Sequence, residues 1–226
     1  MNITIIANGE FPTKKEILDN IAAADRVVCC DGAFEKYVNV NPNLNANLNV
    51  NLNVNCMVTV VGDGDSLSSE VLREAETAGI AFEWVKVEEQ EMNDLTKAVR
   101  YVVGGLRAGQ PAQVDIVGAT GLREDHTLGN VSLLAYYMEQ YPAVRFRMLT
   151  DHGTFLPVRD EACIATRPGQ QVSLFSLTPD VPVTVEGLKW PIENRCLTQW
   201  WQGTLNEAAA DSFTVRGGTI LVYLCL

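Results

Sequence analysis

Short β-branched runs alternate with segments of helical apolar spacing from Ile3 to about Thr150, and this alternation constrains the fold most. The predicted strands are Ile3–Ala7, Arg26–Cys30, Met57–Val61, Phe82–Val85, Val114–Val117 and Val144–Leu149. The predicted helices are Thr13–Ala23, Leu67–Ala78, Asn93–Ala108 and His126–Glu139, with Thr13 as a candidate cap of the first and Ser66 or Ser68 of the second. Strands and helices in this order predict an α/β fold, an open and mainly parallel sheet with flanking helices.

The pattern changes after about Asp151, where short strand-like runs are separated by Gly, Pro, Asn and Asp. The candidate strands are Cys163–Thr166, Gln171–Ser176, Val183–Val185, Thr214–Arg216 and Thr219–Leu224. Closely spaced strands with turn residues between them predict a smaller antiparallel β-sandwich or barrel. We therefore expect two domains, 1–150 and 151–226, with the boundary near residues 151–160.

An unusual tract lies between the second and third predicted strands. From Asn39 to Asn55 every odd position is Asn, with Val, Pro, Leu or Ala between. Asn disfavours strands, and biased Asn-rich tracts are usually disordered, so we interpret residues 39–55 as a flexible insertion. A regular edge hairpin is the alternative, because strict alternation is also the period of a strand.

The charge balance limits the partners. With 17 basic against 28 acidic side chains, the net charge is −11, which argues against nucleic acid or an anionic membrane surface. A small anionic substrate would then need a metal to neutralise it. No apolar run approaches the roughly 18 residues of a membrane span, and the N-terminus has the pattern of a strand rather than of a signal peptide. We expect a cytoplasmic protein whose six cysteines, without CxxC or zinc spacing, are structural thiols.

The first candidate site follows the third predicted strand. The segment Gly62–Ser66 places Asp63 and Asp65 on a glycine-bearing turn directly before a helix. Two carboxylates at a strand end suit a hard divalent cation, and the free amides of the helix start suit a phosphate. An ordinary Asp/Gly turn is the alternative. A calcium loop ending at Glu74 is a weaker one, because two loop positions lack the required oxygen ligand and glycine.

The second candidate site is the segment Gln90–Lys97, which runs into the third predicted helix. Glu91 and Asp94 are three residues apart, as are Asp94 and Lys97, so they share one face of the first helical turn. The alternative is an acidic helix start followed by a solvated ion pair, a frequent and weak arrangement.

The third candidate site is the segment Gly118–His126, after the strand Val114–Val117. Its glycines let the backbone approach a phosphate, the Arg123 fork can bind one, and Asp125 adds a carboxylate. A lone glycine-rich loop is weak evidence. For His126 we favour local capping or hydrogen bonding over a catalytic role.

The three segments follow three strands of one predicted sheet, so their side chains converge on one edge. Several carboxylates beside Arg and Lys, without a P-loop lysine motif, are typical of a magnesium and nucleotide site. Without a cation these acids would repel one another. The residues alone therefore predict metal-dependent transfer from a nucleoside triphosphate.

At these residues the sequence resembles the thiamine pyrophosphokinase family, which makes thiamine diphosphate and AMP from thiamine and ATP. The matching motifs, in chain order, are Cys30–Ala33, Gly62–Ser66, Asp94–Lys97, Gly118–His126, Gly187–Pro191 and Asn206–Glu207. The resemblance implies an α/β nucleotide domain, a C-terminal β-sandwich and a homodimer whose thiamine sites lie between the subunits.

The resemblance also implies roles for individual residues. Magnesium and phosphate carboxylates fall on Asp63, Asp65 and Asp94, with Glu91 in a position where the family usually has Asp. Residues that handle the nucleotide and its phosphates fall on Asp31, Gly32, Ser66, Lys97, Gly118, Thr120, Arg123 and Asp125. Gln90 falls near the thiamine pyrimidine, and Trp190 falls on a tryptophan that packs on thiamine from the partner subunit, a sensible cation–π contact; the alternative for Trp190 is sandwich core. Leu122, where a second Gly is common, and the Asn-rich tract depart from the family pattern.

The implied reaction is attack of the thiamine hydroxyl on the β-phosphorus of ATP, with AMP leaving. Asp65, Asp94 and Lys97 are the candidate catalytic residues, and either Asp94 or Asp65 accepts the hydroxyl proton. Positioning and charge neutralisation should dominate such a reaction. A non-catalytic nucleotide or thiamine sensor using the same pocket is the main alternative, and another nucleotide-dependent kinase is a third.

Overall fold

The computed structural model describes residues 1–40, 57–64, 67–89 and 91–226. These residues form two compact units. The N-terminal unit consists of residues 1–131, 141–145 and 149–151, and the C-terminal unit of residues 132–140, 146–148 and 152–226. Of the predicted Asn-rich insertion, all but Asn39 and Val40 lie outside the described residues.

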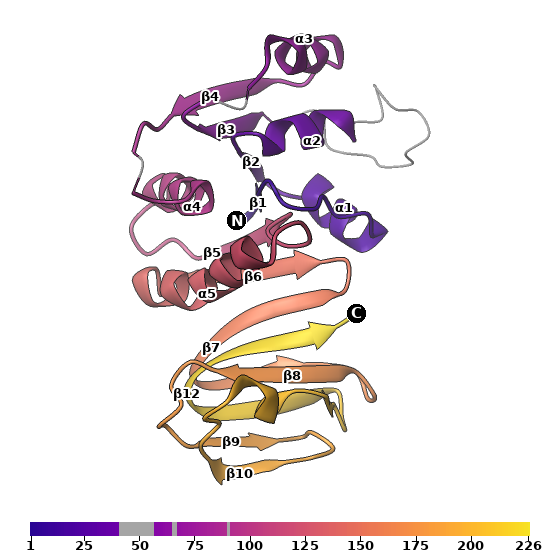
Figure 1. Ribbon diagram of the computed structural model, residues 1–226, viewed down its shortest axis with the longest axis vertical. Coiled ribbons are helices and arrows are strands. Elements are labelled where there is room, and N and C mark those ends of the chain that lie inside the picture. Colours follow the sequence, from indigo (N-terminus) through magenta and orange to yellow (C-terminus); the bar gives the residue numbers. More distant parts are fainter. Residues whose placement is uncertain (41–56, 65–66, 90) are drawn as a thin grey trace. The chain divides into compact units, whose positions relative to one another are not determined.

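The N-terminal unit is built on a parallel sheet (Figure 1). Its strands lie side by side in the order β5 (Ala112–Val117), β1 (Asn2–Ile6), β2 (Arg26–Cys30), β3 (Val58–Gly62) and β4 (Phe82–Lys86). In the centre, Ile3 pairs with Arg26 on one side and Val114 on the other. Because all these strands run the same way, their carboxyl ends share one edge, as the sequence predicted.

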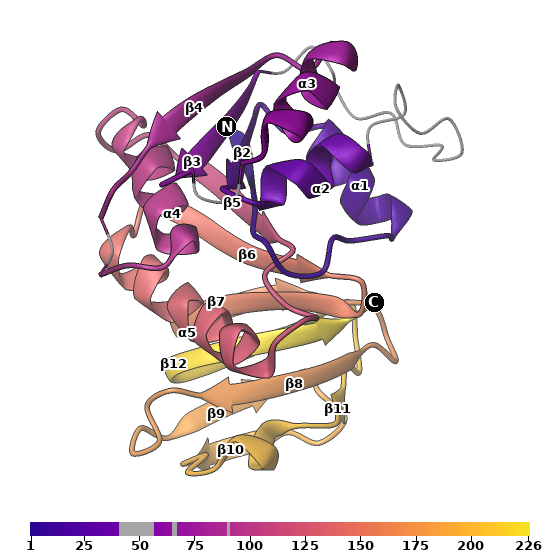
Figure 2. The same cartoon turned by 45° about the horizontal axis from the view of Figure 1, so that its top comes forward.

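Helices cover both faces of this sheet (Figure 2). The helices α1 (Lys15–Ala22), α2 (Ala33–Asn39) and α3 (Ser69–Thr77) share a core with alternate strand residues such as Val27 and Cys29. The helix α4 (Asp94–Gly104) packs on the opposite face, against β2 and β3. Strands buried on both faces explain the nearly continuous apolar runs of the sequence. The helix α5 (Glu124–Gln140) and the strand β6 (Val144–Thr150) contribute residues to both units.

Local expectations were confirmed in part. Ser68 caps α3, because its Oγ accepts a hydrogen bond from the Val71 amide at 3.2 Å. Thr13 does not cap α1; its hydroxyl donates instead to Asp151 Oδ2 at 2.5 Å, and Lys14 precedes the helix without a side-chain cap. The helix α2 was not predicted, and α5 begins two residues before the predicted start at His126.

The C-terminal unit consists of antiparallel strands, as predicted (Figure 1). Its elements are β7 (Gly153–Ala165), β8 (Gln171–Ser176), β9 (Val183–Glu186), β10 (Ile192–Arg195), the short 3₁₀ helix η1 (Trp200–Gly203), β11 (Asn206–Glu207) and β12 (Ser212–Cys225). Strand β12 pairs with β7 along one side, and with β8 and then β9 along the other. The two strands predicted within 214–224 are one strand, because Gly217 and Gly218 adopt positive φ and form a bulge without ending the pairing.

The burial of the described cysteines differs between the units; Cys225 is half-buried, and Cys56 lies outside the described residues. Cys29 and Cys30 are buried in β2, as expected of structural thiols, whereas Cys163 and Cys196 in the C-terminal unit are exposed, so that expectation was wrong for these two. Among the described residues, no helix is long and apolar enough to cross a membrane.

Candidate active site

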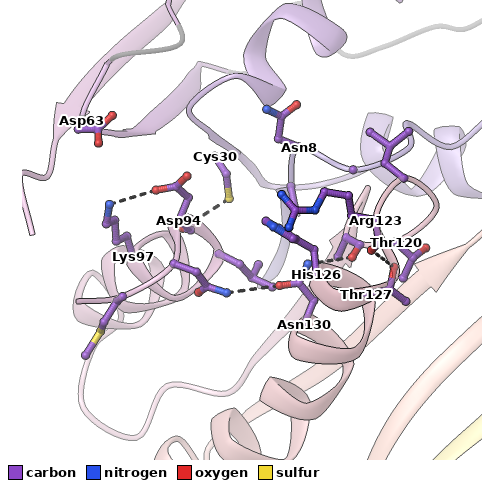
Figure 3. A pocket seen from close by; sticks show the side chains of 17 residues that line it. Asn8, Cys30, Asp63, Asp94, Lys97, Thr120, Arg123, His126, Thr127 and Asn130 are labelled. Carbon is purple, nitrogen blue, oxygen red and sulfur yellow. Dashed lines mark hydrogen bonds and ion pairs between the residues drawn. The ribbon is translucent and has the colours of Figure 1, made fainter. Parts of the chain in front are cut away.

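A cavity of about 450 Å³ opens at the carboxyl edge of the parallel sheet (Figure 3). Segments that follow β1, β3 and β5 and the last residue of β2, Cys30, meet there with the first turns of α4 and α5. The described residues that line it are Ala7, Asn8, Gly9, Cys30, Asp63, Met92, Asn93, Asp94, Leu95, Lys97, Ala119, Thr120, Leu122, Arg123, His126, Thr127 and Asn130. The structure thus brings together, in one pocket of the N-terminal unit, residues from each of the three predicted site segments.

The first turn of α4 supplies an ion pair. Asn93 caps the helix, its Oδ1 accepting a hydrogen bond from the Thr96 amide at 3.0 Å, which aims the turn at the sheet edge. Lys97 Nζ lies 3.1 Å from Asp94 Oδ1, so the two side chains share a helix face as their spacing predicts. The Lys97 side chain is only 4% exposed and that of Asp94 is 51% exposed, so this is more than the solvated pair of the alternative interpretation. The buried ammonium of Lys97 is poorly hydrated, so it can interact strongly with an anionic ligand that reaches it. The accessible carboxylate of Asp94 keeps this charge paired when no ligand is present.

The start of α5 supplies a second pair. Arg123 donates from Nε and Nη2 to the two carboxylate oxygens of Asp125, at 3.1 and 2.5 Å, and the His126 amide donates to Asp125 Oδ1 at 2.9 Å. This pairing raises the pKa of Arg123 and lowers the pKa of Asp125, in each case mainly through the hydrogen bond between them. Both side chains are exposed, and Arg123 lines the pocket while Asp125 does not. The guanidinium is therefore held in a fixed orientation beside the cavity.

His126 lies at the pocket wall, together with its neighbour Thr127 and with Asn130 from the next turn of α5. Asn130 Nδ2 donates to the Ala119 carbonyl at 2.8 Å, which ties α5 to the loop after β5. The sequence favours local capping or hydrogen bonding for His126. Its place on the wall also brings its imidazole ring to the pocket.

The end of β3 and the end of β2 meet beside the cavity. Asp63, half-buried, lines the pocket (Figure 3). Asp31 is 5% exposed and follows β2, where its amide donates to the Val61 carbonyl at 3.0 Å. A Cβ on Gly62 would lie 2.6 Å from the Asp31 Cβ, so only glycine lets the two strand ends approach this closely. Gly32 is buried at the start of α2; neither it nor Asp31 is among the described lining residues.

The buried thiol of Cys30 is a pocket residue that the sequence analysis treated as structural only. Its Sγ donates to the Asp94 carbonyl at 3.6 Å. Burial raises the pKa of Cys30 well above its ordinary value, and the Asp94 and Asp31 carboxylates raise it further. The group is therefore a neutral thiol that joins β2 to α4.

Other pocket residues were missed as well. Asn8 and Gly9 follow β1 directly, and the strand-end rule used for the other segments could have found them. Asn130 carries no comparable signal, because only the winding of α5 brings it to the wall.

The predicted magnesium ligands are only partly described. Asp63 and Asp94 place carboxylate oxygens, the donors magnesium prefers, on the pocket wall. Glu91 is exposed and is not among the described lining residues; its amide donates to the Glu89 carboxylate. Within the part of the chain that is described, no group of three His, Cys, Asp or Glu side chains is placed to hold a metal. Asp65, Ser66 and Gln90 lie outside the described residues.

The other predicted site residues lie on or beside the same loops. Thr120 is on the pocket wall, while Gly118 lies one residue before the lining segment, with a φ of +63°. Leu122, the departure noted in the sequence, lines the cavity and is 62% exposed.

The C-terminal unit has its own smaller cavity, of about 260 Å³, beside Trp190. Its lining residues are Trp190, Pro191, Ile192, Arg195, Gln202, Gly203, Thr204, Leu205 and Asn206. Trp190 is 54% exposed, so the interpretation of this residue as sandwich core was wrong. Its backbone is fixed by Asn206, which accepts from the Trp190 amide at 3.2 Å and donates to the Trp190 carbonyl at 2.7 Å. The Lys189 ammonium lies 5.0 Å from the indole centroid, so the ring already attracts a cation.

Comparisons with known proteins agree on one family. The family model described as "Thiamin pyrophosphokinase, catalytic domain" matches residues 18–146, and the one described as "Thiamin pyrophosphokinase, substrate-binding domain" matches residues 153–223. A curated relative, the thiamine pyrophosphokinase of Bacillus subtilis (strain 168), is 28% identical over 142 residues. That match spans 62% of this chain and 64% of the relative, which is less than two thirds of the relative's length.

Solved structures share the fold. The thiamin pyrophosphokinase of Candida albicans matches with a TM-score of 0.76 and 18% identity, covering 100% of this chain and 90% of that one. The yeast thiamin pyrophosphokinase matches with a TM-score of 0.77 and 16% identity, covering 100% and 86%. A Bacillus subtilis thiamine pyrophosphokinase structure gives a TM-score of 0.76 and 21% identity, covering 100% and 99%. At these identities the structural likeness establishes the fold.

Proposed function

The chain belongs to the thiamin pyrophosphokinase family, and from this we propose that it transfers the pyrophosphoryl group of ATP to the hydroxyl of thiamine, giving thiamine diphosphate and AMP. The observation that carries the proposal is the convergence of Asp94, Lys97 and Arg123 on one cavity at the carboxyl edge of the parallel sheet. This cavity lies within the part of the chain that matches the family's catalytic domain.

The proposed reaction forms a bond between the thiamine hydroxyl oxygen and the β-phosphorus, and breaks the bond between that phosphorus and the oxygen it shares with the α-phosphorus. AMP leaves with the electron pair of the broken bond, and a carboxylate takes the hydroxyl proton. Asp94 is accessible and faces the cavity, which suits it to this role; Asp65 is the alternative. Lys97, held 3.1 Å from Asp94, and the oriented Arg123 neutralise charge on the transferred group.

We propose that the nucleotide lies along the loops that follow β2, β3 and β5. Main-chain amides near Gly118 and Thr120 and at the start of α2, after Asp31 and Gly32, supply donors to phosphate or ribose oxygens. Asp125 orients Arg123 through two hydrogen bonds. Ser66 is the corresponding donor proposed after β3.

We propose Mg²⁺ as the metal, held by Asp63 and Asp94 together with Asp65, with Glu91 either a direct ligand or one that acts through water. When bound, the ion neutralises the polyphosphate. In its absence the carboxylates on an acidic chain of net charge −11 would repel ATP.

Thiamine recognition is proposed for Trp190 and Gln90. The exposed indole of Trp190 can face the cationic thiazolium ring. A homodimer in which Trp190 of one subunit completes the pocket of the other would place both groups at one substrate. The match of residues 153–223 to the substrate-binding domain supports this division of roles.

At the level of the whole chain, we propose residues 1–150 as the catalytic domain and 151–226 as the thiamine-binding domain, in a cytoplasmic enzyme that binds neither nucleic acid nor membranes. The excess of acidic side chains supports the last point, and the five described cysteines, all free thiols, support a reducing compartment.

The test is to incubate purified protein with ATP, MgCl₂ and thiamine and to follow AMP and thiamine diphosphate by chromatography. We expect both products in equal amounts, and neither without magnesium or without thiamine. Thiamine binding without AMP formation would contradict the proposed reaction and favour a non-catalytic sensor. AMP formation with another acceptor but not with thiamine would indicate a different kinase.

A further inference from the structure

Lys36 on α2 binds the loop that follows β1. Its Nζ donates to the carbonyl oxygens of two consecutive residues, Asn8 at 2.8 Å and Gly9 at 2.5 Å. The side chain is half-buried, and burial lowers the pKa of Lys36, an effect that the neighbouring Glu35 carboxylate partly opposes. A desolvated ammonium on two main-chain carbonyls is an ordered contact, unlike the solvated lysines of the surface.

The same loop is held on its other side by the loop after β5. The Ala7 amide donates to Val117 at 2.9 Å, the Gly9 amide to Gly118 at 2.6 Å, and the Glu10 amide to Thr120 at 2.8 Å. A Cβ on Gly9 would collide with the Gly118 carbonyl and lie 2.6 Å from the Thr120 carbonyl. The two loops therefore fit together only with glycine at position 9, and three main-chain hydrogen bonds join them.

Both loops form the wall of the candidate active site. Asn8 and Gly9 line the cavity beside Ala119 and Thr120, and Figure 3 shows Asn8 among the side chains that line it. Because the Asn8 and Gly9 carbonyls accept from Lys36 Nζ, they point toward α2. Lys36 itself is not among the described lining residues. Carbonyl oxygens turned into the cavity would repel phosphate oxygens, so their direction matters for an anionic ligand.

We propose that Lys36 is a positioning residue for the nucleotide: by holding the Asn8 and Gly9 carbonyls, it fixes the paired loops in the conformation that accepts the triphosphate of ATP. The inference rests on the proposed function, because it assumes that a nucleoside triphosphate occupies this cavity. Lys36 acts through the main chain and does not touch the ligand.

The central experiment replaces Lys36 by Met, which keeps an unbranched stem of similar length and removes the charged donors. For Lys36→Met we expect the KM for ATP to rise about tenfold, since the variant loses two hydrogen bonds from a charged group that hold the loop. We expect kcat and the KM for thiamine to stay within about twofold of wild type. Lys36→Arg, which retains the charge and the donors, should recover most of the loss.

Lys15→Met is the matched control. Lys15 is an exposed residue on α1 that pairs with Asp19 at 2.7 Å, away from the cavity. This variant should leave both KM values unchanged. Melting temperatures of all variants, and assays well below them, separate a loss of fold from a loss of ATP binding.

A double-mutant cycle tests the route of the effect. Gly9→Ala forces the paired loops apart, so it should raise the KM for ATP by itself. If Lys36 acts by holding the same loop, adding Lys36→Met to Gly9→Ala should change the KM for ATP by less than threefold. Additive losses, an equal rise in both KM values, or a fall in melting temperature with the KM for ATP unchanged would each overturn the inference.

Titration of ATP and MgCl₂ into the protein without thiamine, followed by calorimetry, separates this inference from the proposed reaction. If the wild type binds ATP but makes no thiamine diphosphate, the proposed function fails, and weaker ATP binding by Lys36→Met still supports the role of Lys36. If the wild type binds no ATP, the inference on Lys36 fails too.

Discussion

The two units build their cavities in opposite ways. The cavity of the N-terminal unit draws residues from Ala7 to Asn130, whereas the lining of the smaller C-terminal cavity runs only from Trp190 to Asn206. Parallel strands need long crossover connections, so segments far apart in sequence meet at one sheet edge. Antiparallel strands joined by short turns keep sequence neighbours together.

The chemistry of the two cavities differs as well. The N-terminal cavity has acidic, basic and amide side chains, including the buried Lys97. Among its described lining residues, the C-terminal cavity has Arg195 as its only charged side chain and Trp190, which is exposed, as its only aromatic one. The difference teaches that the charged cavity is assembled by the topology of one unit from distant segments, while the cavity beside Trp190 is encoded locally in the other.

Thiol reactivity should show the largest contrast between the units. Burial raises the pKa of Cys29 and Cys30, which lowers the reactive thiolate fraction, and both lie in the core, whereas Cys163 and Cys196 are exposed. We expect iodoacetamide at pH 8 to modify the two exposed cysteines at least about 10³-fold faster, since the buried pair reacts only after opening of the structure. Peptide mass spectrometry resolves each site.

In guanidinium chloride all of these cysteines should react at similar rates. Early modification of Cys29 in the folded protein would show that the N-terminal unit opens easily, and the contrast in reactivity would disappear.

Asp94→Asn should have the largest effect on activity. The substitution keeps the size of the side chain and removes the charge that pairs with Lys97 and that, in the proposed reaction, accepts the hydroxyl proton, so we expect kcat to fall by about 10²–10³-fold. The measurement is the rate of AMP formation at saturating thiamine and ATP.

Asp19→Asn is the matched control, because Asp19 is exposed, pairs with Lys15 on α1 and lies outside the cavity. It should retain full activity. Wild-type kcat in Asp94→Asn would remove Asp94 from the reaction and leave Asp65 as the proposed base.

Leu174→Ala tests whether the units are independent in stability. Leu174 is 0% exposed in the core of the C-terminal unit, so its truncation should lower the free energy of unfolding by about 2–5 kcal/mol. We expect urea unfolding followed by circular dichroism to show the loss in one transition, while ATP binding by the N-terminal unit persists at urea concentrations above that transition.

Leu205→Ala is the comparison, since Leu205 lies in the same unit and is 79% exposed. It should change stability by less than about 0.5 kcal/mol. If Leu174→Ala abolishes ATP binding together with its own unit, the two units unfold as one.

Trp190→Ala should give the smallest effect and the most selective one. Loss of a cation–π contact of about 0.5–2 kcal/mol predicts a rise of roughly 2- to 30-fold in the KM for thiamine, with the KM for ATP unchanged. Steady-state rates at varied thiamine and varied ATP separate the two constants. Trp201→Ala, a 72% exposed tryptophan outside the cavity lining, should change neither. An equal rise in the KM for thiamine and the KM for ATP would indicate that Trp190 stabilises the fold rather than contacting thiamine.

The parallel sheet could be predicted because its signals are local. β-branched runs of strand length and apolar residues at helical spacing predicted β1 to β6 and every helix of the N-terminal unit except α2. The missed helix begins at Ala33, the last residue of the motif Cys30–Ala33, and has no capping side chain. Its buried residues Phe34, Tyr37 and Val38 fit a buried strand as well as a short helix, so they did not indicate a helix. Gly217 and Gly218 led to a prediction of two strands in place of one, because a glycine pair is compatible with a turn and with a bulge.

The candidate site divides in the same way. The sequence by itself placed Asp63, Asp94, Thr120 and Arg123 in the segments that lead from a predicted strand into the next predicted helix, and such segments share an edge because the strands are parallel. Only the tertiary structure decided that the Lys97 ammonium is buried, that the Cys30 thiol faces Asp94, and that Lys36 reaches the main chain of the loop after β1. Periodicity fixes which face of an element a side chain occupies, but the distance between two elements is set by packing, and hydrogen bonds and desolvation depend on that distance.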